Sequence, residues 1–202
     1  MNIAAVLLAA GASKRFGENN KLLSDLGGKP LIRRVAEAIV CSGIEVVVVT
    51  GCDRPQIEKA LEGLPLRFAH NLNWESGMGS SIAVGINALG LQTQGAFVVP
   101  GDLPFLTSDL IKDLMAVFME SRGALITYPT TCMGEQRNPV LWPRRFFPSL
   151  AALSGSLGAK QLLQNCEDAQ KQAHVLDESV FVDVDAPTDL EAARSRWYIA
   201  NL

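Results

Sequence analysis

Short apolar runs alternate with amphipathic stretches over the first two thirds of the chain. Residues 3–8 and 44–50 are apolar runs, the second rich in β-branched side chains, which predict strands buried on both faces. Between them, apolar residues recur at helical spacing over 31–40, after Pro30 and before Gly43. This pattern predicts a helix that joins two strands of a parallel sheet.

The same alternation continues to residue 128. It predicts further strands at 66–69, 96–99 and 124–128, and further helices at 55–61, 80–89 and 107–118, the last capped by Thr107 or Ser108. Five alternations predict an α/β fold, three-layered and Rossmann-like, with a mostly parallel twisted sheet and helices on both faces. The pattern then loosens, with weaker signals for strands at 140–142 and 180–184 and helices at 159–165 and 187–198.

Composition and charge narrow the class of protein. The 202 residues are 48% hydrophobic, enough for one core, and the net charge of −3 gives no general attraction to nucleic acid or to an anionic membrane. No apolar run approaches the roughly 20 residues of a membrane-spanning helix. The start lacks the basic region of a signal peptide, and the four cysteines form no CxxC pair. We therefore expect a reduced cytoplasmic protein without a zinc site.

A glycine-bearing loop follows the first predicted strand. Residues 8–17 read LAAGASKRFG, and small residues of this kind let the backbone approach a ligand and turn its N–H groups toward phosphate oxygens. Lys14, Arg15 and Lys21 add the cations that a triphosphate requires. The spacing fits neither GxxxxGK[ST] nor GxGxxG, which disfavours a P-loop protein and a nicotinamide-dependent dehydrogenase.

Carboxylates stand at two places suited to a metal ion. Asp102 directly follows the strand predicted at 96–99, and Mg2+ usually takes one or two protein carboxylates besides substrate phosphate oxygens. Asp183 and Asp185 would share one face of an extended segment. Asp185 is the preferred second ligand and Asp183 the alternative. Asp189 is expected in the first turn of the last helix, where it favours the helix dipole.

The ordered motifs resemble the MobA-like nucleotidyltransferase family, within it the molybdenum cofactor cytidylyltransferases. The matching segments are LAAGASKRFG with KLL at 21–23, GKPL at 28–31, NLNWESGMGSS at 71–81, PGDLP at 100–104, NPV at 138–140 and DVDAPTDL at 183–190. The resemblance implies a fold like that of nucleotide-diphospho-sugar transferases. It also implies one domain over 1–202, with a nucleotide-binding half at 1–128 and an acceptor and metal-completing half at 129–202.

The resemblance also assigns roles to residues. The nucleotide-binding set is Leu8, Ala9, Ala10, Gly11, Arg15, Lys21, Gly79, Ser80 and Ser81, with the triphosphate on Arg15 and Lys21 and the base near 79–81. Lys21, Arg15 and Asp102 would be catalytic, and Asp102 and Asp185 would hold Mg2+. The implied reaction is transfer of CMP from CTP to the phosphate of molybdopterin or the molybdenum cofactor, with release of pyrophosphate.

Details of the motifs bear on both substrates. The guanylyltransferase branch typically has glycine where Ala10 stands, so LAAG with GMGSS favours CTP over GTP. Arg137 replaces a usual glycine, and Ser156 and Lys160 replace an aspartate and an arginine in the expected acceptor half. Another phosphorylated acceptor, such as a sugar phosphate, is therefore an alternative, as is a non-catalytic nucleotide-binding protein that delivers a cofactor. A recipient molybdoenzyme is a further expected partner.

Overall fold

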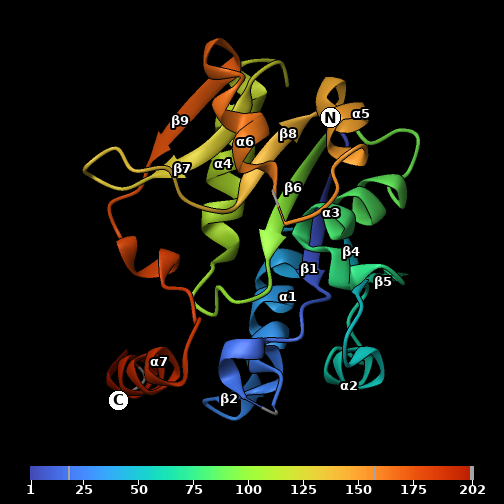
Figure 1. Ribbon diagram of the computed structural model, residues 1–202. Helices are drawn as coiled ribbons and strands as arrows, with labels where there is room; N and C mark the ends of the chain where they lie inside the picture. The colour runs from blue at the N-terminus through green and yellow to red at the C-terminus, as the bar shows by residue number, and fades with distance from the viewer. Residues whose placement is uncertain (18, 157, 201–202) are drawn as a thin grey trace.

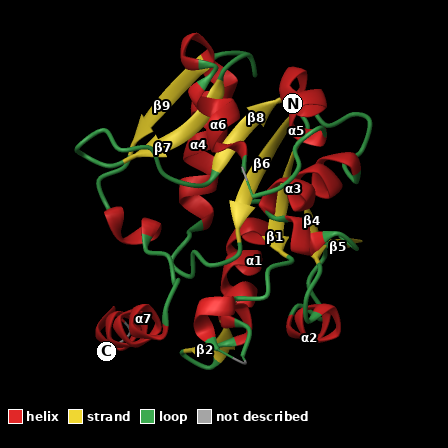
Figure 2. Cartoon of the chain, viewed as in Figure 1, coloured by secondary structure: helices red, strands yellow, loops and turns green. Residues whose placement is uncertain are grey.

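A seven-stranded mixed sheet forms the centre of the computed structural model, which describes residues 1–17, 19–156 and 158–200 (Figure 1, Figure 2). Its order is β5-β4-β1-β6-β8-β7-β9. The strands are β1 Ile3–Ala9, β4 Glu45–Thr50, β5 Arg67–His70, β6 Gly95–Pro100, β7 Ile126–Thr130, β8 Val140–Pro143 and β9 Gln170–His174. Only β8, among these strands, runs antiparallel to its neighbours β6 and β7. The predicted α/β fold with a mostly parallel sheet is confirmed.

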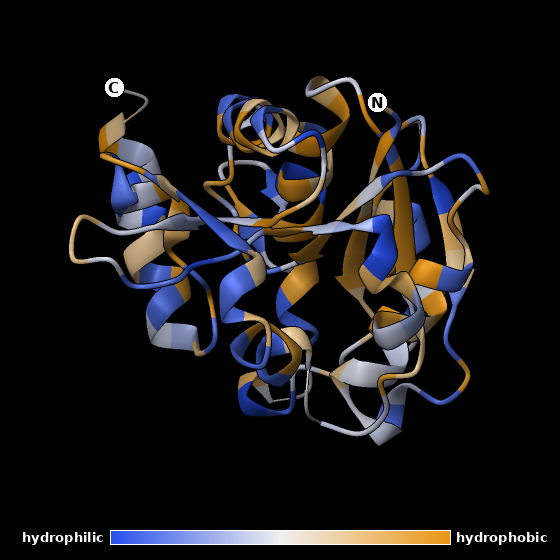
Figure 3. Cartoon of the chain, turned by 90° about the horizontal axis from the view of Figure 1, so that it is seen from above, coloured by the Kyte–Doolittle hydropathy of each residue, from blue (hydrophilic) through white to orange (hydrophobic). Residues whose placement is uncertain are grey.

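Helices cover both faces of this sheet. They are α1 Leu31–Cys41, α2 Arg54–Ala60, α3 Met78–Asn87, α4 Ser108–Glu120, α5 Phe147–Ala151 and α6 Ala159–Gln164, whereas α7 Pro187–Ala200 packs in a separate cluster. One apolar cluster joins α1, α2 and α4 to the sheet, and a second joins α3, α5 and α6 to its other face. Seen from above, the hydrophobic colour is strongest in the strands between the helical layers (Figure 3).

The continuous apolar run of β1 reflects burial on both faces. Ala5 and Leu7 pack in the cluster with α1, whereas Val6 packs in the cluster with α3. Helix α3 approaches the strand closely at Gly85, because a Cβ there would lie 2.2 Å from Cγ1 of Val6. A side chain at residue 85 would therefore push α3 off the sheet.

A third, smaller cluster holds the C-terminal helix. A short antiparallel hairpin, β2 Asp25–Leu26 and β3 Lys29–Pro30, lies beside α7. Leu26 packs there with Val184 and Leu190, and the guanidinium of Arg34 lies 3.6 Å from the ring centroid of Trp197. This packing keeps the loop before α7 near the carboxyl ends of the central strands, on the lower side of Figure 1.

Two sequence-based assignments in the last third differ from the structure. The strand predicted at 180–184 is wrong: Glu178–Phe181 is a 3-10 helix and an irregular segment follows it. The apolar alternation there arises because Val180 packs into the main core while Val184 packs against α7. Strand β9 was not predicted, because its sequence, QKQAH, is polar and pairs only with β7 at the sheet edge.

Other expectations agree with the structure. Thr107 caps α4, accepting a hydrogen bond from the backbone N–H of Leu110 at 3.2 Å. Gly43, which follows α1, has the positive φ of 83° expected of a helix stop. None of the described helices is long and apolar enough to cross a membrane.

Candidate active site

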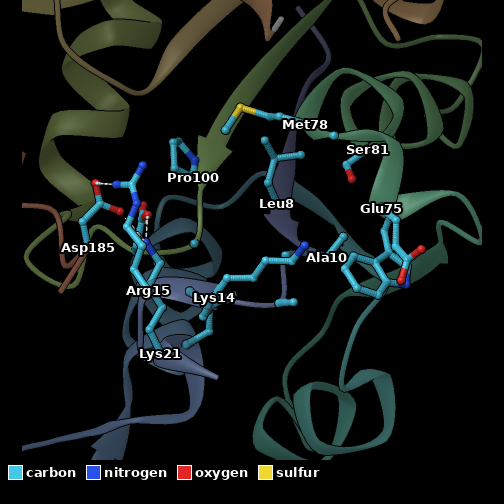
Figure 4. A pocket seen from close by; sticks show the side chains of 18 residues that line it. Leu8, Ala10, Lys14, Arg15, Lys21, Glu75, Met78, Ser81, Pro100 and Asp185 are labelled. Atoms are coloured by element: carbon cyan, nitrogen blue, oxygen red, sulfur yellow. Dashed lines mark hydrogen bonds and ion pairs between the residues drawn. The ribbon is translucent and has the colours of Figure 1, made fainter. Parts of the chain in front are cut away.

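A cavity of about 540 Å³ opens at the carboxyl ends of β1 and β6. Four segments form its wall: the loop after β1, the segment 74–81 that leads into α3, the end of β6 and the loop before α7 (Figure 4). The lining residues are Leu8, Ala10, Gly11, Ala12, Ser13, Lys14, Arg15, Lys21, Leu22, Trp74, Glu75, Gly77, Met78, Ser81, Pro100, Gly101, Asp102 and Asp185. Ligands of open α/β sheets bind at this edge of the sheet.

Most of the sequence-predicted site residues line this cavity. Those that do are Leu8, Ala10, Gly11, Arg15, Lys21, Ser81, Asp102 and Asp185. Ala9 instead packs in the core cluster with α1. Gly79 is buried behind the wall, where its N–H donates to the carbonyl of Gly155 at 3.0 Å. The Ser80 hydroxyl faces the loop carbonyls of Asn73 and Gly77, at 3.1 and 2.8 Å.

Lys21 is the centre of the charged part of the site. Its Nζ lies 2.7 Å from Oδ2 of Asp102 and 2.7 Å from Oδ1 of Asp185, so that one ammonium group bridges both carboxylates. Burial lowers the pKa of Lys21, but the charges and hydrogen bonds of the two carboxylates outweigh it, and the pKa is raised overall. Lys21 therefore stays charged at neutral pH.

Asp185 differs from Asp102 in its exposure. Its side chain is 50% exposed, against 21% for Asp102. The hydrogen bond from Lys21 lowers the pKa of Asp185 despite partial burial, and the charges of Lys21 and Arg15 add to this effect. The guanidinium of Arg15 is turned toward Asp185, with Nη1 3.9 Å from Oδ2, while its side chain is 82% exposed (Figure 4). Arg15 thus remains available to a ligand at the cavity mouth.

Backbone hydrogen bonds hold the two carboxylates together. The N–H of Val184 donates to the carbonyl of Asp102 at 3.1 Å, which ties the loop before α7 to the end of β6. The carboxylate of Asp189 then accepts from the N–H groups of Asp185 and Ala186, at 3.0 and 2.7 Å. Asp189 thereby caps α7 and fixes the backbone that carries Asp185.

The residues present suit a divalent cation. Both carboxylates already converge on one positively charged atom, and Mg2+ needs only one or two protein carboxylates when phosphate oxygens complete its shell. In the described part of the chain, no group of three or more acidic, histidine or cysteine side chains forms a complete metal cage. Asp102 and Asp185 would therefore hold the ion together with a bound substrate.

Asn20, which the sequence analysis did not identify, shapes the glycine loop. It is 5% exposed, and its amide donates to the carbonyl of Gly11 at 3.2 Å and to Oδ2 of Asp53 at 3.1 Å. Its oxygen accepts from the Ser13 hydroxyl at 3.1 Å and from the N–H of Leu22 at 3.0 Å. One buried side chain therefore fixes both ends of the loop and the position of the residue after it, Lys21.

Replacing Asn20 with alanine is expected to lower the free energy of unfolding by about 1–3 kcal/mol, because several buried polar groups would lose their partner. It should also weaken nucleoside triphosphate binding. Chemical denaturation and equilibrium binding measure the two effects. The neighbouring exposed residue provides the control, Asn19→Ala. Equal losses in both variants would contradict the role given to Asn20.

Some residues of the cavity wall that the sequence analysis did not assign to the site lie in segments that it singled out. Trp74, Glu75, Gly77 and Met78 line the cavity and fall within the quoted segment 71–81. Asp53 follows the end of β4, an edge where ligand contacts are expected. Nothing in the hydrophobic pattern distinguishes Asn20 from its exposed neighbour, since its importance depends on a contact with Asp53.

A second cavity of about 420 Å³ adjoins the first and shares Leu8, Met78 and Pro100 with it. Its wall includes the three residues that depart from the family pattern, Arg137, Ser156 and Lys160, and also Asp183. Asp183 and Asp185 therefore line different cavities, and they do not share the face of a strand. Leu157, between Ser156 and Lys160, lies outside the described residues.

Two other proteins are similar to the chain over most of their length. A probable molybdenum cofactor guanylyltransferase of Natronomonas pharaonis is 31% identical over 200 residues, which are 95% of this chain and 96% of that protein. A nicotine blue oxidoreductase of Paenarthrobacter nicotinovorans is 29% identical over 188 residues, 91% of this chain and 92% of that protein.

A solved structure supports the fold. The crystal structure of Rv0371c of Mycobacterium tuberculosis in complex with manganese superposes with a TM-score of 0.77, at 18% identity, over 96% of this chain and 99% of that one. Residues 5–174 match the family of the MobA-like NTP transferase domain. This match spans most of the chain and includes most of the cavity wall, so the protein belongs to the MobA-like NTP transferase family.

Proposed function

We propose that the protein transfers a nucleotidyl group, with CTP as the favoured donor, to the phosphate of a molybdopterin-type acceptor and releases pyrophosphate. The observation that carries this proposal is the Lys21 ammonium, which is held between Asp102 and Asp185 in the cavity that the small-residue loop also lines. This arrangement offers both a cation for phosphate oxygens and carboxylates for a divalent ion.

The reaction would be an in-line displacement at the α-phosphorus. An oxygen of the acceptor phosphate forms a bond to the α-phosphorus, and the bond from that phosphorus to the bridging oxygen of the β-phosphate breaks. Because both reactants are anions, the obstacles are repulsion and positioning. Lys21 would stabilise the charge that develops on the α-phosphate, and Arg15 would bind the departing pyrophosphate at the cavity mouth.

A divalent ion on Asp102 and Asp185 would polarise phosphate oxygens and neutralise their charge. The convergence of both carboxylates on one cation supports this assignment. The manganese complex of the similar Rv0371c supports a divalent ion in general terms. Mg2+ is proposed as the physiological ion because Asp102 and Asp185 offer it only oxygen ligands.

The choice of nucleotide rests on sequence motifs alone. Ala10 and the GMGSS segment at 77–81 favour CTP, whereas the similar protein of Natronomonas pharaonis is named as a guanylyltransferase. Pyrophosphate release should therefore be measured with Mg2+, each nucleoside triphosphate and a molybdopterin acceptor. Acceptor-dependent release with CTP supports the proposal, release with GTP corrects the donor, and no release with any donor contradicts the function.

The second cavity is proposed as the acceptor site, and most of its wall comes from residues 129–202. It adjoins the nucleotide cavity and carries the cations Arg137 and Lys160. The phosphate of a molybdopterin-type acceptor would pair with these two cations. A sugar phosphate would use the same cations, and a recipient molybdoenzyme would take the product.

Replacing Lys160 with alanine is expected to raise the KM for the acceptor about tenfold, since a charge-assisted hydrogen bond is worth about that factor. The Kd for the nucleoside triphosphate should not change, because Lys160 lines the second cavity and not the first. Steady-state kinetics and equilibrium binding measure the two constants. Lys59→Ala, on the exposed side of α2, is the control. If Lys160→Ala changed the affinity for the nucleotide and left the KM for the acceptor unchanged, the assignment of Lys160 to the acceptor site would be contradicted.

A redox activity is the second candidate, since a similar protein is named nicotine blue oxidoreductase. The charged centre of this cavity favours phosphate transfer, because Lys21, Asp102 and Asp185 offer phosphate and metal contacts. Oxidation of NADH or NADPH with reduction of nicotine blue would support the redox candidate. Pyrophosphate release without such oxidation would support the proposed transferase.

A further inference from the structure

A groove lined mainly by apolar side chains lies near the amino end of β6, away from the active-site cavity at the carboxyl end of that strand. It measures about 350 Å³ and is formed by the C-terminal end of α3, the loop that follows it and α5. Leu91 is 86% exposed and forms part of its rim. The apolar residues of this α3–α5 groove are Ile86, Leu89, Leu91, Phe147, Pro148 and Ala151.

Two exposed arginines at this groove lack an acidic partner. Arg144 is a lining residue, and its Nη1 donates to the carbonyl of Thr93 at 2.7 Å. Arg145 follows it, with the guanidinium carbon 4.9 Å from the ring centroid of Phe146. Within the described residues, neither arginine forms an ion pair with a carboxylate. Both cations are therefore available to the carboxylates of a partner.

The sequence around the groove explains this lack of acidic partners. Residues 76–100 and 136–166, which contain α3, α5 and α6, include no aspartate or glutamate, although the whole chain has more acidic than basic residues. Glu45 lies closer to the end of α3, but it is already paired with Arg67. The groove therefore fits an occupant that combines a bulky apolar side chain with unpaired carboxylates.

The loop after β9 has this combination. Leu176 is 96% exposed, and the exposed side chains of Asp177 and Glu178 follow it directly. Asp177 accepts a hydrogen bond from the N–H of Ser179 at 3.0 Å, and Glu178 accepts one from the N–H of Cys132 at 2.9 Å. These hydrogen bonds lower the pKa of both carboxyl groups, so both are ionised at neutral pH. An apolar side chain thus projects into solvent beside two negative charges.

The loop after β9 and the α3–α5 groove lie on opposite sides of the molecule. In Figure 1 the loop that leaves β9 is on the left and α5 is at the upper right, with the central strands between them. One chain therefore cannot place its own Leu176 in its own groove.

We propose that copies of this chain associate head to tail, with Leu176 of one copy in the α3–α5 groove of the next. The carboxylates of Asp177 and Glu178 would then face the two unpaired arginines. This charge complementarity identifies a second copy as the occupant. Because the two surfaces differ, the interface is heterologous, and assembly leads to a ring or to an open chain of copies. The association is independent of the proposed reaction, and its small contact area makes it depend on protein concentration.

Sedimentation velocity at increasing protein concentration, up to about 1 mM, tests this association. The average mass of the wild type should rise with concentration, and added salt should lower it because the ion pairs are screened. Leu176→Asp is expected to weaken association about tenfold or more, since burial of a leucine side chain contributes at least that factor. Leu72→Asp, at a leucine that is 87% exposed on the loop after β5, is the control and should associate like the wild type.

A mixture of two variants tests the head-to-tail arrangement. Leu91→Asp alters the rim of the groove and should prevent association, as Leu176→Asp does, and both exposed positions tolerate the change without loss of the fold. In a 1:1 mixture, the intact groove of Leu176→Asp should accept the intact loop of Leu91→Asp, and assembly should stop at two chains. A mixture in which both variants stay single chains would contradict the arrangement.

The remaining outcomes are equally decisive. A wild type that keeps the mass of one chain at every concentration would overturn the proposal, as would an equal loss of association in Leu72→Asp and Leu176→Asp. If Leu91→Asp abolished association and Leu176→Asp left it unchanged, the groove would have a different occupant, and the proposal would again be overturned.

Discussion

Replacing Asp102 with asparagine is expected to reduce kcat by about a hundredfold or more, the scale of losing one preorganised electrostatic contact in a water-poor site. Asp102 is 21% exposed, contacts Lys21 directly and supplies the less exposed of the two carboxylates. Asparagine preserves the shape of the side chain but removes the charge that would hold a divalent ion. The concentration of Mg2+ needed for half-maximal pyrophosphate release should also rise.

Two variants separate the role of Asp102 from a general effect of charge. Asp109→Asn removes an exposed carboxylate in the first turn of α4, and it should leave both kcat and the Mg2+ requirement unchanged. Asp185→Asn should raise the Mg2+ requirement with a smaller loss of kcat, since Asp185 is half exposed. If Asp102→Asn kept wild-type turnover at saturating Mg2+, Asp102 would not belong to the catalytic centre.

Replacing Lys21 with alanine is expected to lower kcat about tenfold to a hundredfold, because a preorganised cation on the α-phosphate contributes a few kcal/mol in the transition state. The same change should strengthen Mg2+ binding in the absence of nucleotide. Asp102 and Asp185 would lose the ammonium that bridges them, and their mutual repulsion would be relieved by a divalent ion. Thermal unfolding with and without Mg2+ measures this effect as a larger rise in Tm than in the wild type.

Lys112→Ala is the control for this experiment, because Lys112 lies on α4 and, among the residues that the structure describes, forms an ion pair only with exposed Asp109. It should show the wild-type turnover and the wild-type response of Tm to Mg2+. Unchanged turnover in Lys21→Ala would remove Lys21 from the mechanism. Loss of turnover without the larger Mg2+ response would separate the catalytic cation from the metal site.

The sequence predicted the central part of the fold because a strand that is buried on both faces needs apolar residues at successive positions. The apolar run of β1 and the β-branched run of β4 correspond to neighbouring parallel strands of the sheet. Strand β9 has no such apolar run, because this polar edge strand is stabilised by pairing with β7 rather than by burial. The segment at 180–184 has the opposite problem: its alternation resembles a strand, but its apolar residues enter two different clusters.

The candidate site was predictable where chemistry is concentrated in a local motif. Lys21, Asp102 and Asp185 were identified from their place beside predicted strands and from the family resemblance, and the structure brings them together. Ser80 and Ser81 could not be told apart in the same way. They are adjacent, chemically identical and hydrogen-bonded to the side-chain amide of Asn71, and only the path of the chain decides which hydroxyl faces the cavity.

The sequence by itself determined the layered α/β architecture, the small-residue loop and the identity of the charged groups, because periodicity and residue type are local properties of the chain. The tertiary structure alone decided that Lys21 bridges two carboxylates, because Asp102 and Asp185 lie 81 and 164 residues away from it along the chain. It also decided the hydrogen bonds of Asn20 and Asn71. A buried amide acts through partners that folding brings within hydrogen-bond distance, and the sequence next to the amide does not indicate which residues these partners are.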